Sequence, residues 1–176
     1  DQIWNDCITG GKLDSGFFLN FGSLASKIVY AASSQDVPFP AKKERELKKL
    51  LLSTNAAVTI RESSLSEYCS SLTGVEYPIV LDPTLLAGRS VMEEISIKKK
   101  SKHGTFILLY QIDANPNSDV SVKTIEKRFG QACFTMTVPR LGSIHGRKGD
   151  IGPEQFLFYL KHAEFLVTNS FHGVAL

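Results

Sequence analysis

Cysteine is scarce in this sequence, and long hydrophobic runs are absent. The 176 residues include three cysteines, Cys7, Cys69 and Cys133, which are far apart and form no Cys-x-x-Cys pair. Such spacing argues against a disulfide framework and favours reduced thiols in a cytoplasmic protein. No apolar stretch approaches the roughly 20 residues that span a bilayer, and the first residues lack the basic and apolar regions of a signal peptide. We therefore expect a cytoplasmic protein.

An excess of one charge and metal-binding motifs are also lacking. The formal net charge is +2, which is too small to indicate a nucleic-acid surface. A lysine-rich run at residues 98–102 is most simply a solvated linker, because no aromatic residues interleave with it. The histidines have no paired spacing with cysteines or carboxylates, and there is no P-loop or dinucleotide fingerprint. The sequence therefore predicts no metal, no cofactor and no nucleic-acid partner.

Strand and helix patterns alternate through the first half of the chain. Short apolar runs predict buried strands at residues 27–32, 56–60 and 78–81. Between them, apolar stripes at helical spacing predict helices at residues 41–52 and 64–72. Strands joined by helices through short connections predict βαβ units, which form a mostly parallel sheet covered on both faces. Residues 1–90 are therefore expected to form an N-terminal Rossmann-like domain.

The alternation weakens at residues 91–104 and then restarts. The polar, lysine-rich sequence there predicts an interdomain linker. Beyond it, the patterns predict strands at residues 105–112, 132–138 and 165–168, and helices at residues 118–129 and 153–161. Residues 105–176 are expected to form a second Rossmann-like domain, incomplete at its end. The predicted fold class is thus α/β, with two Rossmann-like domains.

The segment 168–173 is the strongest local candidate for a site. A predicted strand ends there, small polar residues turn the chain, and a helix begins. A helix start presents backbone N–H groups and a positive dipole end, which suit a phosphate or carboxylate bound by Asn169, Ser170 and Gly173. His172 would stand beside that anion and could transfer protons. The alternative is that Asn169 and Ser170 merely cap the helix while His172 packs or faces water.

Arg61 is a second candidate because it follows a predicted strand directly. A guanidinium at the carboxyl end of a strand can bind a carboxylate or phosphate bidentately. Arg61, Glu62 and Asp82 all sit at predicted carboxyl ends, the edge at which ligands bind in such sheets. The alternative for Arg61 is a surface ion pair with Glu62. Asp82 is followed by proline, which is equally typical of a plain turn.

A basic, glycine-rich loop and several carboxylates complete the candidates. The loop at residues 140–150 could be an anion-binding lid or a solvated loop, and its basic residues are Arg140, His145, Arg147 and Lys148. Carboxylates at strand ends are candidate acid or base groups, and they are Asp1, Asp14 and Asp82.

Taken in order, short segments along the whole chain resemble the polysaccharide pyruvyl transferase family. They are DQIWN (residues 1–5), FFLNF (17–21), YAAS (30–33), VTIRE (58–62), VLDPTLL (80–86), GPEQF (152–156) and TNSFHG (168–173). Each segment is weak evidence alone, whereas their joint order and spacing are specific.

The resemblance implies a fold, a donor and an acceptor. The fold is a GT-B-like pair of Rossmann-like domains with the active site in the cleft between them, the acceptor on the N-terminal side and the donor on the C-terminal side. The donor is phosphoenolpyruvate. The acceptor is a sugar or lipid-linked oligosaccharide of a surface polysaccharide, which allows peripheral membrane contact. The product is a pyruvate ketal that bridges two hydroxyls.

The resemblance also implies site residues. The family's functional histidine precedes the glycine of the last motif, which here is His172, with Asp1 as a second catalytic candidate. Many members carry Arg-Leu-His-Gly where this chain has residues 170–173 as Ser-Phe-His-Gly. Positive charge would therefore come from elsewhere, with Arg61 and Arg147 as the substrate-binding candidates and Arg140 and Lys148 as further sources.

Members of the family normally extend further at both ends. They carry an N-terminal strand with a Gly-rich, Asp-containing turn before the position of Asp1, and further helices after that of Leu176, so the sequence is expected to be truncated at both ends. Two other functions stay open at this point: a GT-B-type glycosyltransferase that uses a nucleotide sugar, and a non-catalytic binding module.

Overall fold

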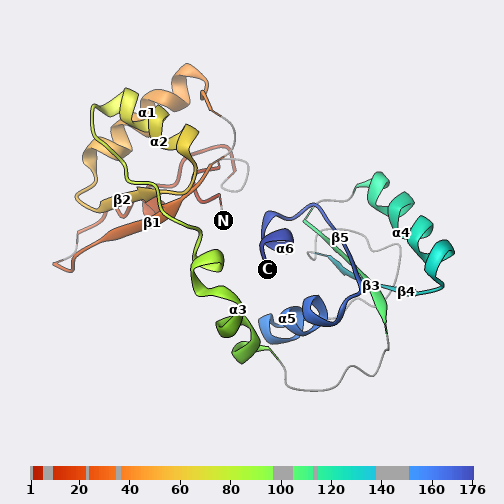
Figure 1. Cartoon of the computed structure of the whole chain (residues 1–176). Helices are drawn as coiled ribbons and strands as arrows, with labels where there is room; N and C mark the ends of the chain where they lie inside the picture. The colour runs from red at the N-terminus through yellow and green to blue at the C-terminus, as the bar shows by residue number, and fades with distance from the viewer. Residues whose placement is uncertain are drawn as a thin grey trace. The chain divides into compact units, whose positions relative to one another are not determined.

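The chain forms two compact units, Asp1–Pro83 and Thr84–Leu176, which are described separately here (Figure 1). In this computed structural model, the structure describes residues 2–5, 10–22, 24–34, 37–96, 105–112, 115–137 and 151–176. Each unit combines helices with a parallel sheet. The predicted α/β class is therefore confirmed, while the predicted domain boundaries stay predictions.

The first unit follows the predicted order of strands and helices. Its elements are a 3-10 helix η1 (Ser15–Phe18), β1 (Ile28–Ala32), α1 (Ala41–Ser53), β2 (Ala57–Ile60) and α2 (Ser63–Thr73). Strands β1 and β2 pair in parallel. Helix α2 ends at Gly74, whose φ of 74° is the left-handed conformation that glycine adopts at low cost.

The strand predicted at residues 78–81 is wrong as a full strand. Only Ile79 makes a parallel bridge, to Ile60 of β2. The carbonyl oxygen of Pro78 accepts a hydrogen bond from Ile60 N at 3.0 Å, and Val80 N donates to Ile60 O at 2.9 Å. The ladder stops there because Pro78 has no N–H to donate and because α3 begins at Pro83.

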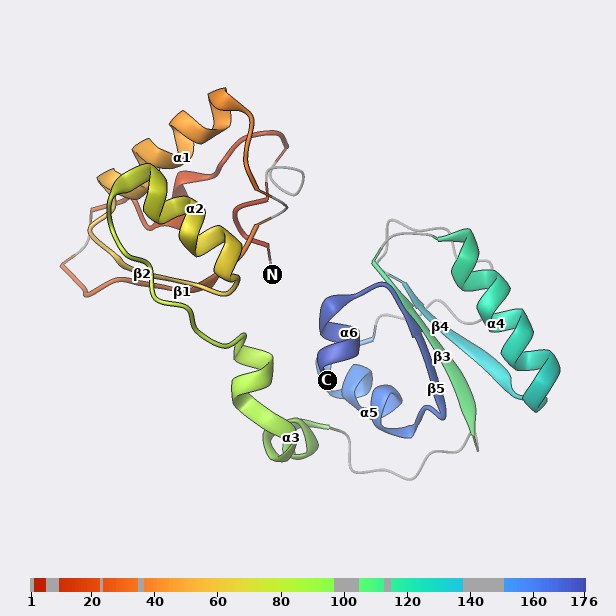
Figure 2. The ribbon, with the colours of Figure 1, turned by 45° about the horizontal axis from the view of Figure 1, so that its top comes forward.

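Both helices of the first unit lie on the same face of its sheet. Successive segments add in one direction, in the order β1, β2 and Ile79. Right-handed crossovers that move in one direction place their helices on one face, as Figure 2 shows for α1 and α2. The predicted two-sided cover is therefore wrong for the described part of this unit, where Ile28 and Tyr30 of β1, which alternate with the buried Val29, are exposed on the other face.

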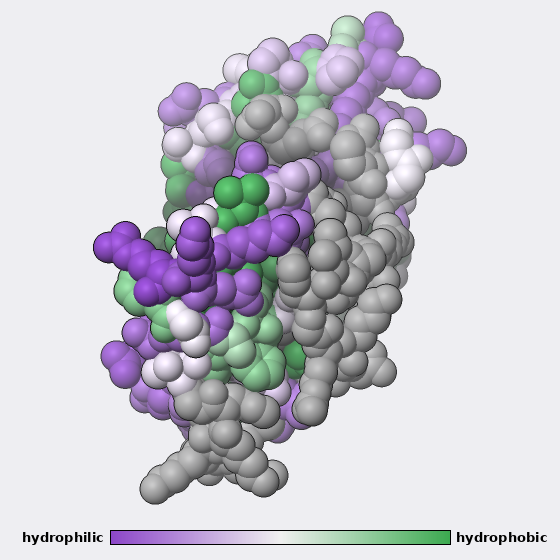
Figure 3. Space-filling model, turned by 90° about the vertical axis from the view of Figure 1, so that its right-hand side faces the viewer, coloured by the Kyte–Doolittle hydropathy of each residue, from purple (hydrophilic) through white to green (hydrophobic). Residues whose placement is uncertain are grey.

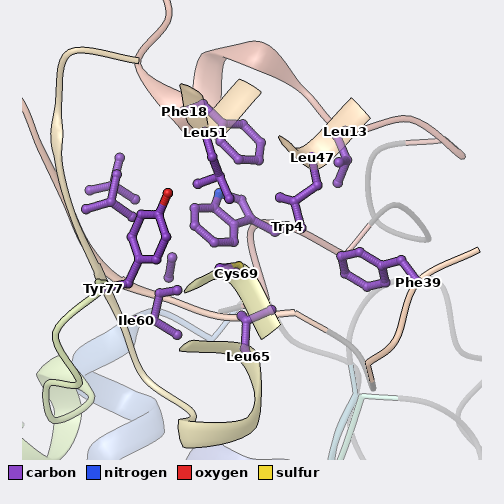
Figure 4. Close-up of a cluster of buried hydrophobic side chains, with 13 residues drawn as sticks. Trp4, Leu13, Phe18, Phe39, Leu47, Leu51, Ile60, Leu65, Cys69 and Tyr77 are labelled. Atoms are coloured by element: carbon purple, nitrogen blue, oxygen red, sulfur yellow. The ribbon is translucent and has the colours of Figure 1, made fainter. Parts of the chain in front are cut away.

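Trp4 organises the core of the first unit. Its indole stacks on the ring of Phe18, with centroids 4.8 Å apart and an interplanar angle of 3°. Both side chains are fully buried, and Figure 4 shows them among side chains from both helices and the sheet. Leu47 of α1 and Leu65 of α2 close the same cluster. The core thus joins the N-terminal segment to the βαβ units.

The second unit begins with a helix that the sequence analysis did not predict. Its elements are α3 (Pro83–Ile95), β3 (Phe106–Gln111), α4 (Pro116–Phe129), β4 (Ala132–Thr137), α5 (Pro153–His162), β5 (Phe165–Thr168) and α6 (Phe171–Ala175). Helix α3 is kinked at Gly88, where φ is 70°. Lys161 of α5 pairs with Glu93 of α3 at 3.3 Å. Because α3 extends to Ile95, the first residues of the linker predicted at residues 91–104 are helical.

The sheet of the second unit is covered on both faces. Its strand order is β4-β3-β5, and both pairings are parallel. The chain moves in one direction across the sheet from β3 to β4, and then in the opposite direction from β4, past β3, to β5. Because both crossovers are right-handed, the reversal places α4 and α5 on opposite faces of the sheet. Accordingly, Val122 of α4 packs on Ile107 and Leu109, while α5 packs on Phe106 and Leu108. The predicted two-sided cover is confirmed here.

Apolar side chains also reach the surface in both units. Figure 3 shows apolar surface beside strongly hydrophilic surface on one side of the molecule. Such exposure is ordinary for folded proteins. Within the described ranges, no helix is both long enough and apolar enough to cross a bilayer.

Replacing Phe18 tests the role of the buried aromatic stack. We expect Phe18→Ala to lower the free energy of unfolding of the first unit by about 3–5 kcal/mol, because it removes a fully buried ring and leaves a cavity. Denaturant unfolding followed by the fluorescence of Trp4, the only tryptophan in the sequence, measures this. The neighbouring Phe17 is 39% exposed, so Phe17→Ala should cost less than about 1 kcal/mol. Equal losses in the two variants would contradict this account of the core.

Candidate functional site

Polar side chains from three neighbouring parallel segments converge at the carboxyl edge of the first unit's sheet. Ser33 follows β1, Arg61 and Glu62 follow β2, and Asp82 follows the bridge at Ile79. Arg61 Nε donates to Glu62 Oε1 at 2.7 Å, and its Nη1 donates to Asp82 Oδ2 at 2.7 Å. Ser33 Oγ accepts from Arg61 Nη2 at 2.8 Å and donates to Glu62 Oε1 at 2.7 Å. We call these four residues the Arg61 network.

The Arg61 network is largely shielded from water. The side chain of Arg61 is 12% exposed and that of Asp82 is 4% exposed. Burial by itself lowers the pKa of Arg61, but the hydrogen bonds to Glu62 and Asp82 outweigh it and raise the pKa above its usual value. The guanidinium therefore stays charged at any working pH. Glu62 Oε2 is buried and accepts no hydrogen bond from the described residues, so the network can take one further donor.

This geometry bears on the two interpretations of Arg61, as an anion-binding residue and as the partner of Glu62 in a surface ion pair. The predicted ion pair with Glu62 forms, but it belongs to a larger set that also includes the buried residues Asp82 and Ser33. A role for Arg61 in substrate binding stays a prediction. Any anionic ligand would meet a guanidinium that is already neutralised by two carboxylates.

The second candidate set lies at the carboxyl edge of the second unit's sheet, where β5 runs into α6. Asn169 Oδ1 accepts a hydrogen bond from Ile112 N at 2.9 Å, which joins the end of β5 to the end of β3. Ser170 is buried, and its Oγ accepts from Gly173 N at 3.2 Å as the N-cap of α6. Of the two residues that the alternative interpretation expects to cap the helix, Ser170 is the N-cap. The amide oxygen of Asn169 bonds the end of the neighbouring strand β3.

Gly173 allows α6 to lie close against the sheet. A Cβ atom at this position would lie 2.7 Å from Thr168 Oγ1 and 2.9 Å from Tyr110 Cδ1. Tyr110 belongs to the core on the α5 face of the sheet, so α6 starts on that face, whereas α4 follows β3 onto the opposite face. The neighbouring strands β3 and β5 are thus followed by helices on opposite faces. Open α/β sheets bind ligands at such a topological switch point.

His172 lies in the first turn of α6, at this switch point. Its ring packs edge-on against Phe171, with centroids 5.1 Å apart, and the side chain is half-buried. It therefore has both an aromatic neighbour and access to solvent. The structure brings together the predicted residues of the segment 168–173, namely Asn169, Ser170, His172 and Gly173.

Other predicted site residues lie outside the described residues. These are Asp1 and the loop residues Arg140, His145, Arg147 and Lys148. Asp14, another candidate, accepts from Gly16 N at 2.8 Å as the N-cap of η1. Over the described ranges, no group of three or more His, Cys, Asp or Glu side chains is placed to hold a metal ion.

Ser33 is the residue of the Arg61 network that the sequence analysis missed. The available signal was the same as for Arg61, because Ser33 directly follows a predicted strand. Its contacts with Arg61 and Glu62 span 28 and 29 residues. They depend on the parallel register of β1 and β2, which periodicity does not provide.

A double-mutant cycle tests the coupling of Arg61 to Asp82. Arg61→Met should lower the free energy of unfolding of the first unit by about 3 kcal/mol, because a buried carboxylate loses the cation that faces it. Adding Asp82→Asn should recover part of this loss, giving a coupling of at least about 1 kcal/mol. Denaturant unfolding followed by Trp4 fluorescence measures each variant. The exposed Arg45 is the control, since Arg45→Met should cost less than about 0.5 kcal/mol. Additive losses at residues 61 and 82 would contradict the coupling.

A methyl group at Gly173 tests the close approach of α6. We expect Gly173→Ala to destabilise the second unit by about 1–3 kcal/mol, because Thr168 and Tyr110 must shift to admit the new atom. Thermal unfolding followed by circular dichroism measures the loss. Gly152 has open space around it and an ordinary φ of −73°, so Gly152→Ala should cost less than about 1 kcal/mol. A Gly173→Ala variant as stable as Gly152→Ala would show that α6 is not packed this closely.

Comparison with known proteins gives one family. The family model described as polysaccharide pyruvyl transferase matches residues 8–176. That range includes the Arg61 network and the β5–α6 segment, while Asp1 lies before it. No curated protein and no solved structure gave a significant match. Since the family model covers nearly the whole sequence, the chain belongs to the polysaccharide pyruvyl transferase family, a family of transferases of polysaccharide biosynthesis.

Proposed function

We propose that this protein transfers the enolpyruvyl unit of phosphoenolpyruvate onto a pair of sugar hydroxyls, forming a pyruvate ketal on a surface polysaccharide or its precursor. Within the family assignment, the observation that carries this proposal is the position of His172. His172 lies in the first turn of α6, directly after β5, at the switch point where the helices that follow β3 and β5 lie on opposite faces of the sheet. A histidine at such an edge suits proton transfer.

The reaction needs proton transfers that a histidine can perform. The C3 atom of phosphoenolpyruvate gains a proton and becomes a methyl group, which makes C2 electrophilic. One sugar hydroxyl and then a second bond to C2, and the bond from C2 to the phosphate oxygen breaks. The two hydroxyl protons balance the one that C3 gains and the one that leaves with inorganic phosphate. We propose His172 as the general acid or base in these steps, with Asp1 as a second such group.

Phosphoenolpyruvate carries a phosphate at one end and a carboxylate at the other, so its binding site needs positively charged side chains and N–H donors. We propose that Asn169 and Ser170, before α6, and Gly173, in its first turn, contact the phosphate or carboxylate of the donor. Arg61 and Arg147 would bind the other anionic group and stabilise the charge that develops as phosphate departs. In this proposal the buried carboxylate of Asp82 and the partly exposed carboxylate of Glu62 hold the guanidinium in one orientation. Their negative charge limits how strongly the guanidinium attracts the donor.

The acceptor and the setting are part of the same proposal. The acceptor would be a sugar or a lipid-linked oligosaccharide met in the cytoplasm, with peripheral contact to a membrane. The GT-B-like arrangement of two Rossmann-like domains stays a prediction. No cofactor is required, because the donor carries its own leaving group.

Phosphate release tests the reaction class. The full chain is incubated with phosphoenolpyruvate and acceptors that end in galactose, mannose or glucose, and inorganic phosphate is measured. The proposal predicts release that depends on the acceptor, together with a ketal methyl signal in the NMR spectrum of the product. If the protein instead turns over a nucleotide sugar and does not use phosphoenolpyruvate, the proposed pyruvyl transfer is wrong and the protein is a glycosyltransferase.

Replacing His172 tests the catalytic assignment. We expect His172→Ala to lower kcat by about 10²–10⁴-fold, the usual contribution of a general acid or base, while circular dichroism shows an intact fold. His162 is a matched control, because it ends α5 at the amino edge of the sheet and bonds Phe158 O through Nδ1 at 2.7 Å. His162→Ala should keep a rate near that of the wild type. A His172→Ala enzyme with the wild-type rate would remove His172 from the mechanism.

A further inference from the structure

Strand β1 contains a bulge just before it reaches the Arg61 network. Val29 pairs with Val58 and Ala32 pairs with Ile60, so two residues of β1 oppose the single residue Thr59 of β2. Ala31 lies in this bulge with a φ of 52°, a left-handed conformation that costs energy for a residue with a side chain. Bulges are rare in parallel pairs and often lie near active sites, where they re-aim a side chain.

The side chain of Thr59 takes the place of the ladder bonds that the bulge disrupts. Its Oγ1 accepts a hydrogen bond from Ala31 N at 3.0 Å and donates to Val29 O at 3.2 Å. One hydroxyl thus satisfies both a donor and an acceptor of the distorted strand. Valine has nearly the same shape but could make neither bond.

The bulge determines where Ser33 lies. With Ala32 paired to Ile60, the next residue, Ser33, comes level with Arg61, and Ala32 O accepts from Arg61 N at 3.0 Å. In a regular continuation of the pairing of Val29 with Val58, Ser33 would be level with Glu62 instead. Such a shift of one residue turns a side chain to the other face of a sheet. The extra residue therefore sets the side on which the hydroxyl of Ser33 is presented.

Ser33 in turn restricts the guanidinium of Arg61. The serine is fully buried, and its hydroxyl bonds both Arg61 Nη2 and Glu62 Oε1. A guanidinium binds anions through a planar fork, so its orientation decides whether it can bind bidentately. A contact that fixes this plane acts on binding without touching the ligand.

We propose that Thr59 is a positioning residue for Arg61: its hydroxyl holds the β1 bulge, the bulge places Ser33, and Ser33 orients the guanidinium. The effect on donor binding rests on the proposed role of Arg61. The effect on Arg61 itself does not depend on that role. The two parts can therefore be measured separately.

A threonine in the same unit provides a matched control. Thr54 Oγ1 donates to Phe18 O at 2.7 Å and accepts from Ala56 N at 3.1 Å, the same kind of bonds that Thr59 makes. Thr54 lies before the amino end of β2, however, whereas the Arg61 network lies at the carboxyl end. Thr54→Val and Thr59→Val should therefore lower stability to a similar extent. Only Thr59→Val should change Arg61.

The test compares Thr59→Val, Thr59→Ser and Thr54→Val in the full chain. The first readout is the NMR signal of the Arg61 Nε–H group and its rate of exchange with water. We expect Thr59→Val to speed this exchange about tenfold, the effect of weakening one hydrogen bond by roughly 1.4 kcal/mol. Thr59→Ser, which keeps the hydroxyl, should restore slow exchange, and Thr54→Val should leave it unchanged.

The second readout is kinetic. If Arg61 binds the donor, Thr59→Val should raise the KM for phosphoenolpyruvate about tenfold, because a less firmly oriented guanidinium binds the donor more weakly. The variant should also lower kcat, because the same guanidinium stabilises the charge that develops as phosphate departs. If Thr59→Val does not fold, Ser33→Ala interrupts the same chain of contacts and should also speed the exchange at Arg61.

The outcomes separate the two proposals. Wild-type exchange at Arg61 in Thr59→Val, or an equal change in Thr54→Val, would overturn the positioning role of Thr59. Faster exchange with an unchanged KM would support that role and remove Arg61 from donor binding. Faster exchange in a protein that never uses phosphoenolpyruvate would support the positioning role and overturn the proposed function.

Discussion

Right-handed crossovers between parallel strands are the constraint on which both candidate sets depend. Parallel strands all end at one edge, so the residues that follow them meet there whatever their separation in the sequence. In the first unit the crossovers run in one direction, and the edge gathers Ser33, Arg61, Glu62 and Asp82. In the second unit the direction reverses, and the reversal creates the switch point beside His172.

The two edges differ in their chemistry. At the first, a guanidinium is enclosed by two carboxylates and a buried hydroxyl, so its charge is compensated and its orientation is fixed. At the second, Asn169 and Ser170 fix the backbone around a half-buried imidazole. Rigid positioning of a few polar groups at the end of a sheet is what a transferase needs, because catalysis depends on geometry that is set before the substrate binds.

Much of this arrangement follows from local sequence patterns, and the remainder depends on tertiary contacts. Apolar periodicity located α1, α2, α4, α5 and the five strands, and the turn before α6 was recognisable from its small polar residues. Periodicity does not determine which face a crossover helix covers, so the one-sided first unit was not expected. Helix α3 was missed because Gly88 interrupts its helical pattern and a lysine-rich sequence follows at residues 98–102, so the segment resembles a linker. The bulge at Ala31 and the role of Ser33 arise from register, which becomes defined only when β1 meets β2.

An NMR titration of the full chain with phosphoenolpyruvate tests most directly whether the residues at the carboxyl edge of each sheet bind the donor. The account predicts that the largest chemical-shift changes occur at the amides that follow β3 and β5, namely Ile112, Asn169 and Gly173, and at the Arg61 Nε–H group. The amino edge, where His162 precedes β5, should stay unchanged. Chemical-shift changes concentrated at the amino edge would contradict the account. So would the absence of any change when phosphoenolpyruvate is added to saturating concentration.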